Sequence, residues 1–324
     1  MSSLRNLLEE YLVEGASGRH VLITIGKGGV GKTTFSILAG LIYSRHGKTL
    51  IASLDPAKHL LEYLGLNKPL SVERIEGDLY AVQYDIAPLA KKLSDEYALL
   101  LRQVMPGLTI VNLDDVVKAV KMAPGFEEEV FLRILEELYN SDYDYIVIDT
   151  PPTGVTHRIL NLPRLHMFWI EKLHELRARI VSLRYAMARA MGRKVELKDP
   201  VLAKLQELYD RYKGLWKQMT DSQRTTTAII ATPEPLPVYE AKTTIDLLRQ
   251  LNIKCRMLVV NRVLPEDKAR EIGLLEVQRK SIEEALEITS GECRVIGIMQ
   301  HVKTPKTLEE ARELLDRVIT PVTV

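Results

Sequence analysis

Residues 21–33 read Val-Leu-Ile-Thr-Ile-Gly-Lys-Gly-Gly-Val-Gly-Lys-Thr. The apolar run over residues 21–25 predicts a buried parallel strand, and the pattern over residues 32–43 predicts a helix. Between them, residues 26–33 satisfy the motif G-x-x-x-x-G-K-[ST] in the strand, loop and helix order that a phosphate-binding loop requires. The stretch therefore predicts an α/β domain that binds a nucleoside triphosphate.

Each residue type in the loop has a use in phosphate binding. The glycines let backbone N–H groups curl around a phosphate at the positive end of the following helix. Lys32 can reach the β- and γ-phosphates, and the Thr33 hydroxyl can ligate Mg²⁺. We assign nucleotide binding to the loop residues Gly28, Gly29, Val30, Gly31, Lys32, Thr33 and Thr34.

A second lysine, Lys27, precedes the glycines. A lysine at the start of the loop cannot easily fold back onto phosphates that Lys32 already contacts. We expect Lys27 to act in trans, neutralising charge on the phosphoryl group bound by a partner subunit, as an arginine finger does. This role implies a homodimer with facing nucleotides. The alternative is a solvated surface lysine.

Two aspartates follow predicted strands, where ligands bind in a parallel sheet. Asp149 ends the apolar run over residues 145–149, so we expect it to hold Mg²⁺ through water, with Gly154 as a switch near the γ-phosphate. Asp55 follows the strand over residues 49–53 and is the candidate for orienting or deprotonating the attacking water. Either aspartate alone is also typical of a helix N-cap.

Composition limits the class of protein. The chain has 324 residues, 46% of them hydrophobic, and a formal net charge of +1, which gives no global reason to expect a nucleic-acid partner. No apolar run reaches the roughly 18 residues that span a bilayer, so we expect a cytoplasmic protein that visits a membrane surface only transiently. Cys255 and Cys293 are too few for a disulfide framework, and we interpret both as buried small apolar residues.

Short β-branched runs alternate with helical patterns along the chain. This alternation predicts an α/β fold, a P-loop domain with a mostly parallel sheet flanked by helices. The candidate strands after the first cover residues 49–53, 79–84, 145–149, 227–232, 257–261 and 295–299. Two long helical stretches interrupt the pattern and predict a helical subdomain. The expected segments are 1–85, 141–154 and 225–324 for the ATPase domain, with insertions at 86–140 and 155–224.

These motifs resemble those of the deviant Walker-A ATPases. The chain is most similar to the family of arsenite-pump ATPases and ATPases that target tail-anchored membrane proteins. The residues that carry the resemblance span nearly the whole chain: 26–34, 55–57, 124–128, 149–154, 158–163, 232–240 and 259–262. The resemblance implies ATP and Mg²⁺ as cofactors, a dimer-dependent site containing Lys27 and Asp55, and an adenine contact from Asn261.

The chain also departs from that family. It has neither the Cys-x-x-Cys zinc clamp of eukaryotic targeting members nor the metalloid-binding cysteines of pump members, so we expect no zinc. The first switch has Lys58 and His59 where relatives commonly have His and Asn. The second has Val155 where relatives often have His, with His157 nearby.

The insertions carry apolar positions at helical spacing. From 172 to 194, apolar residues recur every three or four positions, while the other faces carry arginines. Methionine adapts to varied apolar ligands, so such helices can line a groove for a transmembrane segment. Periodicity alone favours stripes that pack against each other, because most amphipathic helices are core helices, and the resemblance favours the groove instead. The groove candidates are Leu101, Met105, Met167, Leu176, Ile180, Leu183, Met187 and Met191.

The sequence thus predicts an ATP-hydrolysing homodimer that shields the transmembrane helix of tail-anchored clients and delivers them to a membrane, where a receptor is a candidate partner. Two alternatives remain. One is a positioning ATPase of the Min/Par type acting on membrane or DNA, and the other is the ATPase subunit of an anion pump.

Overall fold

The computed structural model describes residues 3–14, 18–104, 126–192, 199–289, 291, 293–299 and 305–316. Within these ranges the strands form one eight-stranded sheet in the order β3-β4-β2-β5-β1-β6-β7-β8. The strands are β1 His20–Gly26, β2 Thr49–Ser53, β3 Glu73–Glu76, β4 Leu79–Gln83, β5 Tyr145–Asp149, β6 Thr225–Ala231, β7 Cys255–Val263 and β8 Arg294–Met299. All neighbours pair in parallel except β3, which runs antiparallel to β4.

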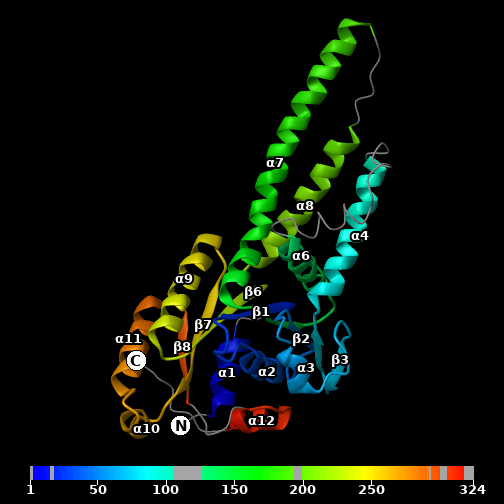
Figure 1. Cartoon of the computed structure of the whole chain (residues 1–324). Helices are drawn as coiled ribbons and strands as arrows, with labels where there is room; N and C mark the ends of the chain where they lie inside the picture. Colours follow the sequence, from blue (N-terminus) through cyan, green and yellow to red (C-terminus); the bar gives the residue numbers. More distant parts are fainter. Residues whose placement is uncertain are drawn as a thin grey trace.

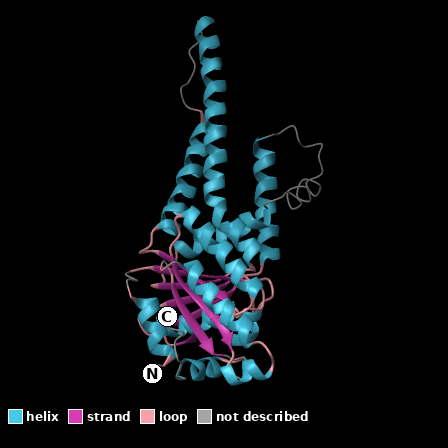
Figure 2. Ribbon diagram, turned by 90° about the vertical axis from the view of Figure 1, so that its left-hand side faces the viewer, coloured by secondary structure: helices cyan, strands magenta, loops and turns pink. Residues whose placement is uncertain are grey.

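Helices cover both faces of this sheet (Figures 1 and 2). Those before β5 are α1 Leu4–Val13, α2 Lys32–Tyr43, α3 His59–Leu64, α4 Ile86–Val104 and α6 Phe126–Tyr139. The later ones are α7 Thr153–Ala190, α8 Pro200–Thr220, α9 Pro235–Leu251, α10 Glu266–Glu271, α11 Leu275–Thr289 and α12 Leu308–Asp316.

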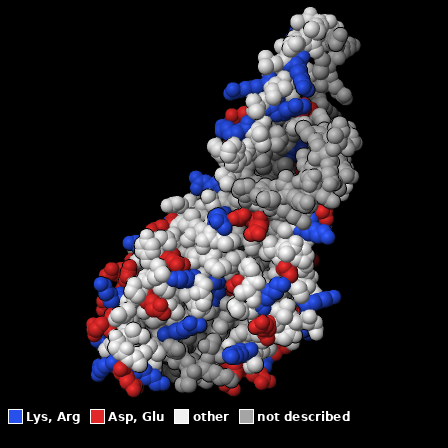
Figure 3. Space-filling model, viewed as in Figure 1, with Lys and Arg blue, Asp and Glu red and all other residues white. Residues whose placement is uncertain are grey.

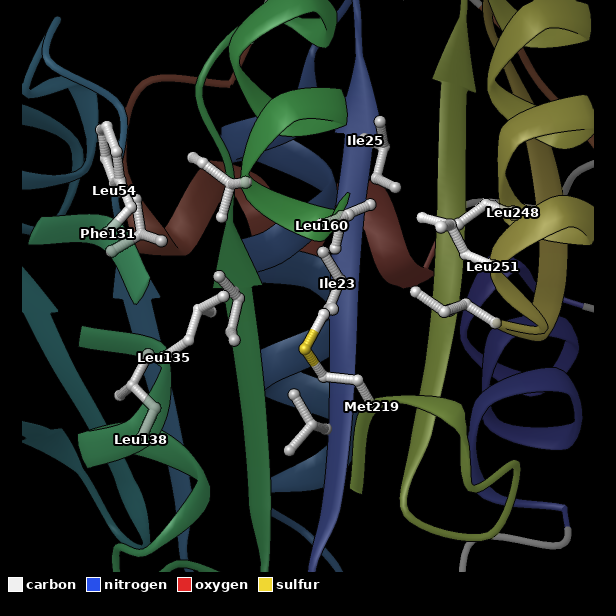
Figure 4. Close-up of a cluster of buried hydrophobic side chains, with 14 of the residues drawn as sticks. Ile23, Ile25, Leu54, Phe131, Leu135, Leu138, Leu160, Met219, Leu248 and Leu251 are labelled. Carbon is white, nitrogen blue, oxygen red and sulfur yellow. The ribbon is translucent and has the colours of Figure 1, made fainter. Parts of the chain in front are cut away.

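Alternate residues of the central strands enter two separate hydrophobic cores. One core contains Ile23 and Ile148 and receives α6, α9 and the sheet-proximal parts of α7 and α8. Figure 4 shows part of it, with Leu160 of α7 and Met219 of α8 beside Ile23 of β1, and Leu135 of α6 on the other side of β5. The other core receives α1, α2, α3 and α12. Strands buried on both faces have continuous apolar runs, and for this reason the central strands could be predicted from the sequence.

The structure confirms the predicted α/β fold with a mostly parallel sheet. Strand β3 was missed because it is a short edge strand with charged residues, which has no apolar run. The interpretation of the two cysteines was incomplete. Cys255 and Cys293 are both buried, but they form a disulfide that links the start of β7 to the residue before β8. The two positions are 38 residues apart in the chain, so their contact follows from the strand pairing and not from any local pattern.

The helix α7 extends far beyond the sheet (Figure 1). It has 38 residues, a length of about 57 Å at 1.5 Å per residue. Its base packs on the sheet through Ile159, Leu160 and Ile170, and α8 lies alongside it (Figure 2). Arg177 binds the carboxylate of Asp199, the residue that caps α8, at 2.7 Å. None of the described helices combines the length and the apolar composition needed to cross a membrane.

Candidate nucleotide site and apolar helix face

The phosphate-binding loop lies between β1 and α2, at the carboxyl edge in the middle of the sheet. Two of its glycines are required by geometry. A Cβ at Gly26 would lie 2.3 Å from the carbonyl oxygen of Ile230, and Gly31 has a φ of 103°, in the left-handed region that favours glycine. Since α2 starts at Lys32, its free N–H groups and the positive end of its dipole lie at the loop. Thr34 lies in the first turn of the same helix.

The loop is held by Lys32 and by a strand from the other half of the sheet. Lys32 is buried, and its Nζ donates to the carbonyl oxygen of Lys27 at 3.1 Å. Burial lowers the pKa of this ammonium, while Asp149, Asp55 and Glu240 oppose the shift. Asn261 of β7 donates from Nδ2 to the carbonyl oxygen of Val30 at 2.8 Å. The residue that we expect to contact adenine therefore also fixes the shape of the phosphate loop.

Asp149 lies at the centre of a buried cluster of hydroxyls. Its Oδ2 accepts hydrogen bonds from Thr33 Oγ1 at 2.8 Å and from Ser53 Oγ at 3.2 Å. Its Oδ1 is buried and has no hydrogen-bond partner among the described residues. Burial is the main cause that raises the pKa of Asp149 from 3.8 to about 6, against the opposing effect of the Thr33 hydrogen bond.

These residues fit a Mg²⁺ ion bound with a nucleotide. The ion prefers oxygen ligands and is usually held by one or two protein groups together with substrate phosphates and water. Thr33 supplies a hydroxyl, and Asp149 supplies an unpaired carboxylate oxygen beside it. A divalent cation here would compensate the buried negative charge, which the protein itself only partly satisfies.

Asp55 lies just beyond β2 and is partly exposed. Its Oδ1 accepts a hydrogen bond from the backbone N–H of Ala57 at 3.0 Å, and its carbonyl oxygen accepts from Gln83 Nε2 at 3.0 Å. The carboxylate therefore closes its own turn in this structure. Its Oδ2 remains for the water-orienting role that we assign to Asp55, and the negative charge is close enough to raise the pKa of Asp149.

Lys27 has an acidic partner within its own chain. Its Nζ lies 3.7 Å from Oε1 of Glu240 on α9, and both side chains are about one-third exposed. The other carboxylate oxygen of Glu240 accepts a hydrogen bond from Thr153 Oγ1 at 2.8 Å. Thr153 is the first residue of α7. Glu240 thus connects the start of the phosphate loop to the base of the long helix.

Several side chains at the site were not predicted from the sequence. Ser53 and Gln83 end neighbouring strands, so their polar type at the carboxyl edge was an available signal. Glu240 ends the stretch 232–240 that carries part of the family resemblance, but it follows the loop by more than 200 positions and no role at the site was assigned to it. Two residues of the switches also have partners in the structure. Lys58, which differs from relatives in the first switch, binds Asp85 at 2.7 Å. His157, near the second switch, shares a hydrogen bond with Thr244 of α9 at 2.9 Å.

The outer part of α7 exposes a line of large apolar side chains. Most of the groove candidates are in this line, and none of them is buried. The exposed fractions are 57% for Leu176, 38% for Ile180, 65% for Leu183, 62% for Met187 and 64% for Met191. Trp169 and Leu173 extend the line toward the sheet, with exposed fractions of 58% and 50%. Among the described residues, no helix buries this line.

Three groove candidates differ from this group. Met167 is partly buried and packs against the core beside the sheet. The side chain of Leu101, in α4, lies outside the described residues, and so does Met105. On the side of α7 that faces α8, a cavity of about 290 Å³ is lined by Ile170, His174, Leu205 and Tyr209, with the polar chains Glu171, Glu175 and Gln206.

Comparison with known proteins gives a consistent result. Residues 19–291 match the family described as anion-transporting ATPase. The chain is 30% identical to "Putative arsenical pump-driving ATPase 2" of Aquifex aeolicus, over 80% of this chain and 86% of that protein. It is 32% identical to "ATPase GET3A" of Arabidopsis thaliana, over 79% of this chain and 70% of that protein. It is 27% identical to "ATPase ASNA1 homolog 2" of Paramecium tetraurelia, over 99% and 98%. The chain is an ATPase and belongs to the anion-transporting ATPase family.

Proposed function

We propose that this ATPase shields the transmembrane helix of tail-anchored membrane proteins and delivers them to a membrane. The observation that carries the proposal is the exposed apolar line on α7, from Trp169 to Met191. Contiguous apolar surface on a soluble domain marks a binding site, and an apolar line at helical spacing fits another apolar helix. The relatives named GET3A and ASNA1 support the same function through the targeting family that the motifs resemble.

A direct connection between the apolar line and the nucleotide site supports control by ATP. The helix α7 begins four residues after Asp149, and its first residue, Thr153, is bound to Glu240. Glu240 in turn lies beside Lys27 of the phosphate loop. A change in the position of Lys27 on nucleotide binding therefore reaches the base of the helix that carries the client surface.

A single exposed helix cannot enclose a transmembrane segment, which is apolar on all sides. In the proposed homodimer, two copies face each other across their nucleotides and bring two α7 faces together around one client. Lys27 leaves Glu240 and reaches the phosphoryl group bound by the partner, where it neutralises charge that develops during transfer.

Each residue of the site has a role in the proposed hydrolysis. Lys32 and the loop amides hold the phosphates, and Thr33 and Asp149 would hold Mg²⁺, which would supply positive charge next to the phosphates. Asp55 leaves its turn with Ala57 and orients the attacking water for in-line displacement, accepting its proton. Loss of the γ-phosphate removes the group that holds Lys27 in trans, so the dimer loosens and releases the client at the membrane.

Co-expression with a client tests the proposal. The Asp55→Asn protein is produced with a tagged membrane protein that has one C-terminal transmembrane helix, and size exclusion then detects a soluble complex. We expect an ATP-dependent complex that disappears when Leu183 and Met187 are changed to Asp. Ser182→Asp is the matched control, because Ser182 is exposed on another face of α7. A complex that survives the apolar-face changes would contradict the proposed site.

A second candidate is suggested by the name of the Aquifex aeolicus relative, which describes a protein that drives an arsenical pump. On that account, arsenite or antimonite should stimulate ATP hydrolysis by this chain. We expect no stimulation, because the two cysteines are buried and joined in a disulfide, which leaves no thiol to bind the metalloid. Stimulation of several-fold at micromolar oxyanion would favour the pump instead.

A further inference from the structure

We propose that the outer half of α7 is also a binding surface for anionic lipid headgroups, used by the client-free protein at a bilayer. The proposal goes beyond client shielding, because it assigns a ligand to the charged side chains next to the apolar line. It rests on the distribution of arginines along residues 177–192 and on their positions around the helix.

This segment of α7 is strongly basic. Residues 177–192 contain Arg177, Arg179, Arg184 and Arg189, with no aspartate or glutamate. The chain as a whole is nearly neutral, with 44 basic and 43 acidic residues, so the excess is local. Figure 3 shows Lys and Arg side chains gathered on the projecting part of the molecule, whereas both signs alternate over the sheet domain.

One of the four arginines has an evident structural role, and the other three do not. Arg177 is bound to Asp199 and holds α7 against the start of α8. Arg179, Arg184 and Arg189 are exposed, and in the part of the chain that the structure describes no carboxylate forms a salt bridge with them. The nearest acidic residue in sequence, Glu175, is bound to Lys172.

Two of the free arginines, Arg179 and Arg184, lie next to the apolar line, whereas Arg189 lies farther round the helix. At about 100° per residue, Leu176, Ile180, Leu183 and Met187 fall on one side of the helix, away from the face that packs on α8. On the same helix projection, Arg179 borders this line on one side and Arg184 borders it on the other. Long arginine stems can extend along the apolar surface while the guanidinium groups reach outward.

An apolar stripe bordered by cations on both sides is typical of a helix that lies in a membrane interface. The apolar side chains enter the boundary between headgroups and acyl chains, and guanidinium groups bind phosphate oxygens in pairs. A transmembrane client helix would satisfy the apolar line but would leave the arginines without anions. A bilayer containing anionic lipid satisfies both.

The expected strength follows from the number of free cations. Two arginines that border the apolar line should favour an anionic surface over a neutral one by roughly thirtyfold in partitioning at moderate salt. Because exposed charges are screened within about 8 Å at physiological ionic strength, the preference should fall steeply with added salt.

Vesicle flotation of the full chain tests the proposal. Vesicles of phosphatidylcholine alone are compared with vesicles containing about one-third phosphatidylglycerol. We expect binding to the anionic vesicles that is lost in high salt and that falls at least tenfold when Arg179, Arg184 and Arg189 are all changed to Gln. The matched control changes the exposed Lys268, Arg270 and Lys280 on α10 and α11 to Gln, which alters the net charge equally. That control should bind like the unchanged protein.

Other outcomes separate this proposal from the proposed function. The triple arginine variant should keep its basal ATPase rate and its soluble client complex. The double variant Leu183→Asp with Met187→Asp should bind neither the client nor the vesicles. Equal binding to neutral vesicles, or anionic binding unchanged in the arginine variant, would overturn the lipid site. Binding to duplex DNA through the same three arginines, without vesicle binding, would also overturn it and assign the surface to nucleic acid.

Discussion

Lys27, the lysine expected to act across a dimer interface, lies 3.7 Å from Glu240 of its own chain. The pair is partly exposed, and such ion pairs contribute about 0.2–1 kcal/mol. Glu240 also accepts a hydrogen bond from Thr153 at the start of α7. We interpret the contact as a resting position for Lys27, weak enough to be exchanged for a phosphoryl group in a partner subunit.

Replacing Glu240 with Gln should favour the ATP-dependent dimer. Gln keeps an oxygen acceptor for Thr153 but removes the charge that holds Lys27. From the strength of an exposed ion pair, we expect the dimer dissociation constant with Mg-ATP to fall about two- to fivefold. Analytical ultracentrifugation measures this change, with the exposed Glu271→Gln as control. A dimer weakened by Glu240→Gln would show that Glu240 supports the closed state instead.

Asp149→Asn should affect stability and metal binding in opposite directions. The pKa of Asp149 is raised from 3.8 to about 6, so the folded state holds this proton more tightly than the unfolded state. The stability that this tighter proton binding adds to the folded state is fully present below about pH 4 and is lost as the pH rises through about 6. Asn carries no charge, so above pH 6 the free energy of unfolding of the nucleotide-free variant should exceed that of the unchanged protein by about 1–3 kcal/mol. This difference should disappear near pH 4.

The same substitution removes the ligand proposed for Mg²⁺. We therefore expect Mg-ATP to raise the melting temperature of the unchanged protein more than that of Asp149→Asn at pH 7.5. In the unchanged protein, this Mg²⁺-dependent gain should decline as the pH falls through about 6, where the carboxylate takes up a proton. Thermal denaturation with and without Mg²⁺ measures both effects. Equal gains in the two proteins would remove Asp149 from the metal site.

Asp55→Asn should separate binding from turnover. The amide can still close the turn with Ala57, so ATP affinity should change less than threefold. Loss of the group that orients and deprotonates water should lower kcat by about 10²–10⁴-fold. Single-turnover hydrolysis with labelled ATP measures the chemical step directly. A kcat within a factor of three of the unchanged value would assign water activation to another residue.

Asp85 should matter more for stability than its ion-pair partner. Asp85 Oδ2 binds Lys58 Nζ at 2.7 Å, and Asp85 Oδ1 accepts from the backbone N–H of Ala87 in the first turn of α4, at 3.3 Å. Asp85→Ala removes a helix cap and an ion pair, at about 1–3 kcal/mol together. Asp85→Asn and Lys58→Met remove only the pair and should each cost less than about 1 kcal/mol. Urea denaturation gives the comparison, and equal costs for all three variants would exclude the capping role.

The disulfide should stabilise the edge of the sheet that contains β7 and β8. It closes a segment of 38 residues, for which chain entropy gives about 4 kcal/mol of stability. Reduction should therefore lower the melting temperature clearly, whereas the Cys255→Ser variant should melt at the same temperature with and without reductant. An unchanged melting temperature on reduction of the unchanged protein would show that burial alone holds the two strands.

The sequence predicted the parts of the fold that follow from local pattern. The phosphate loop, the apolar strands and the helix starting at Lys32 each have a distinctive order of residue types, and the structure contains these elements with nearly the same bounds. The edge strand β3 has no apolar run and was not recognisable. The pairing of Cys255 with Cys293 depends on the neighbouring positions of β7 and β8, which no local pattern specifies.

In the candidate site, too, the residues in local motifs were predicted and those that depend on tertiary contacts were not. Thr33, Asp149 and Asn261 were predicted from motifs, and the structure brings all three to the loop. Glu240 was assigned no role, because its contact with Lys27 depends on how α9 packs beside β1 and the base of α7. Periodicity placed the apolar line of α7 but could not show whether another helix covered it. Only the tertiary arrangement reveals that these side chains are exposed.

Site-specific photocrosslinking tests the central claim most directly. A photoreactive amino acid at Leu183, on the exposed apolar line, is compared with one at Ser182 on another face of the same helix. The Asp55→Asn background retains ATP, and a tail-anchored client is supplied during synthesis. We expect a crosslink from position 183 to the transmembrane helix of the client with ATP, and little from position 182 or with ADP. Crosslinks of equal yield from both positions, or none to the transmembrane helix, would contradict it.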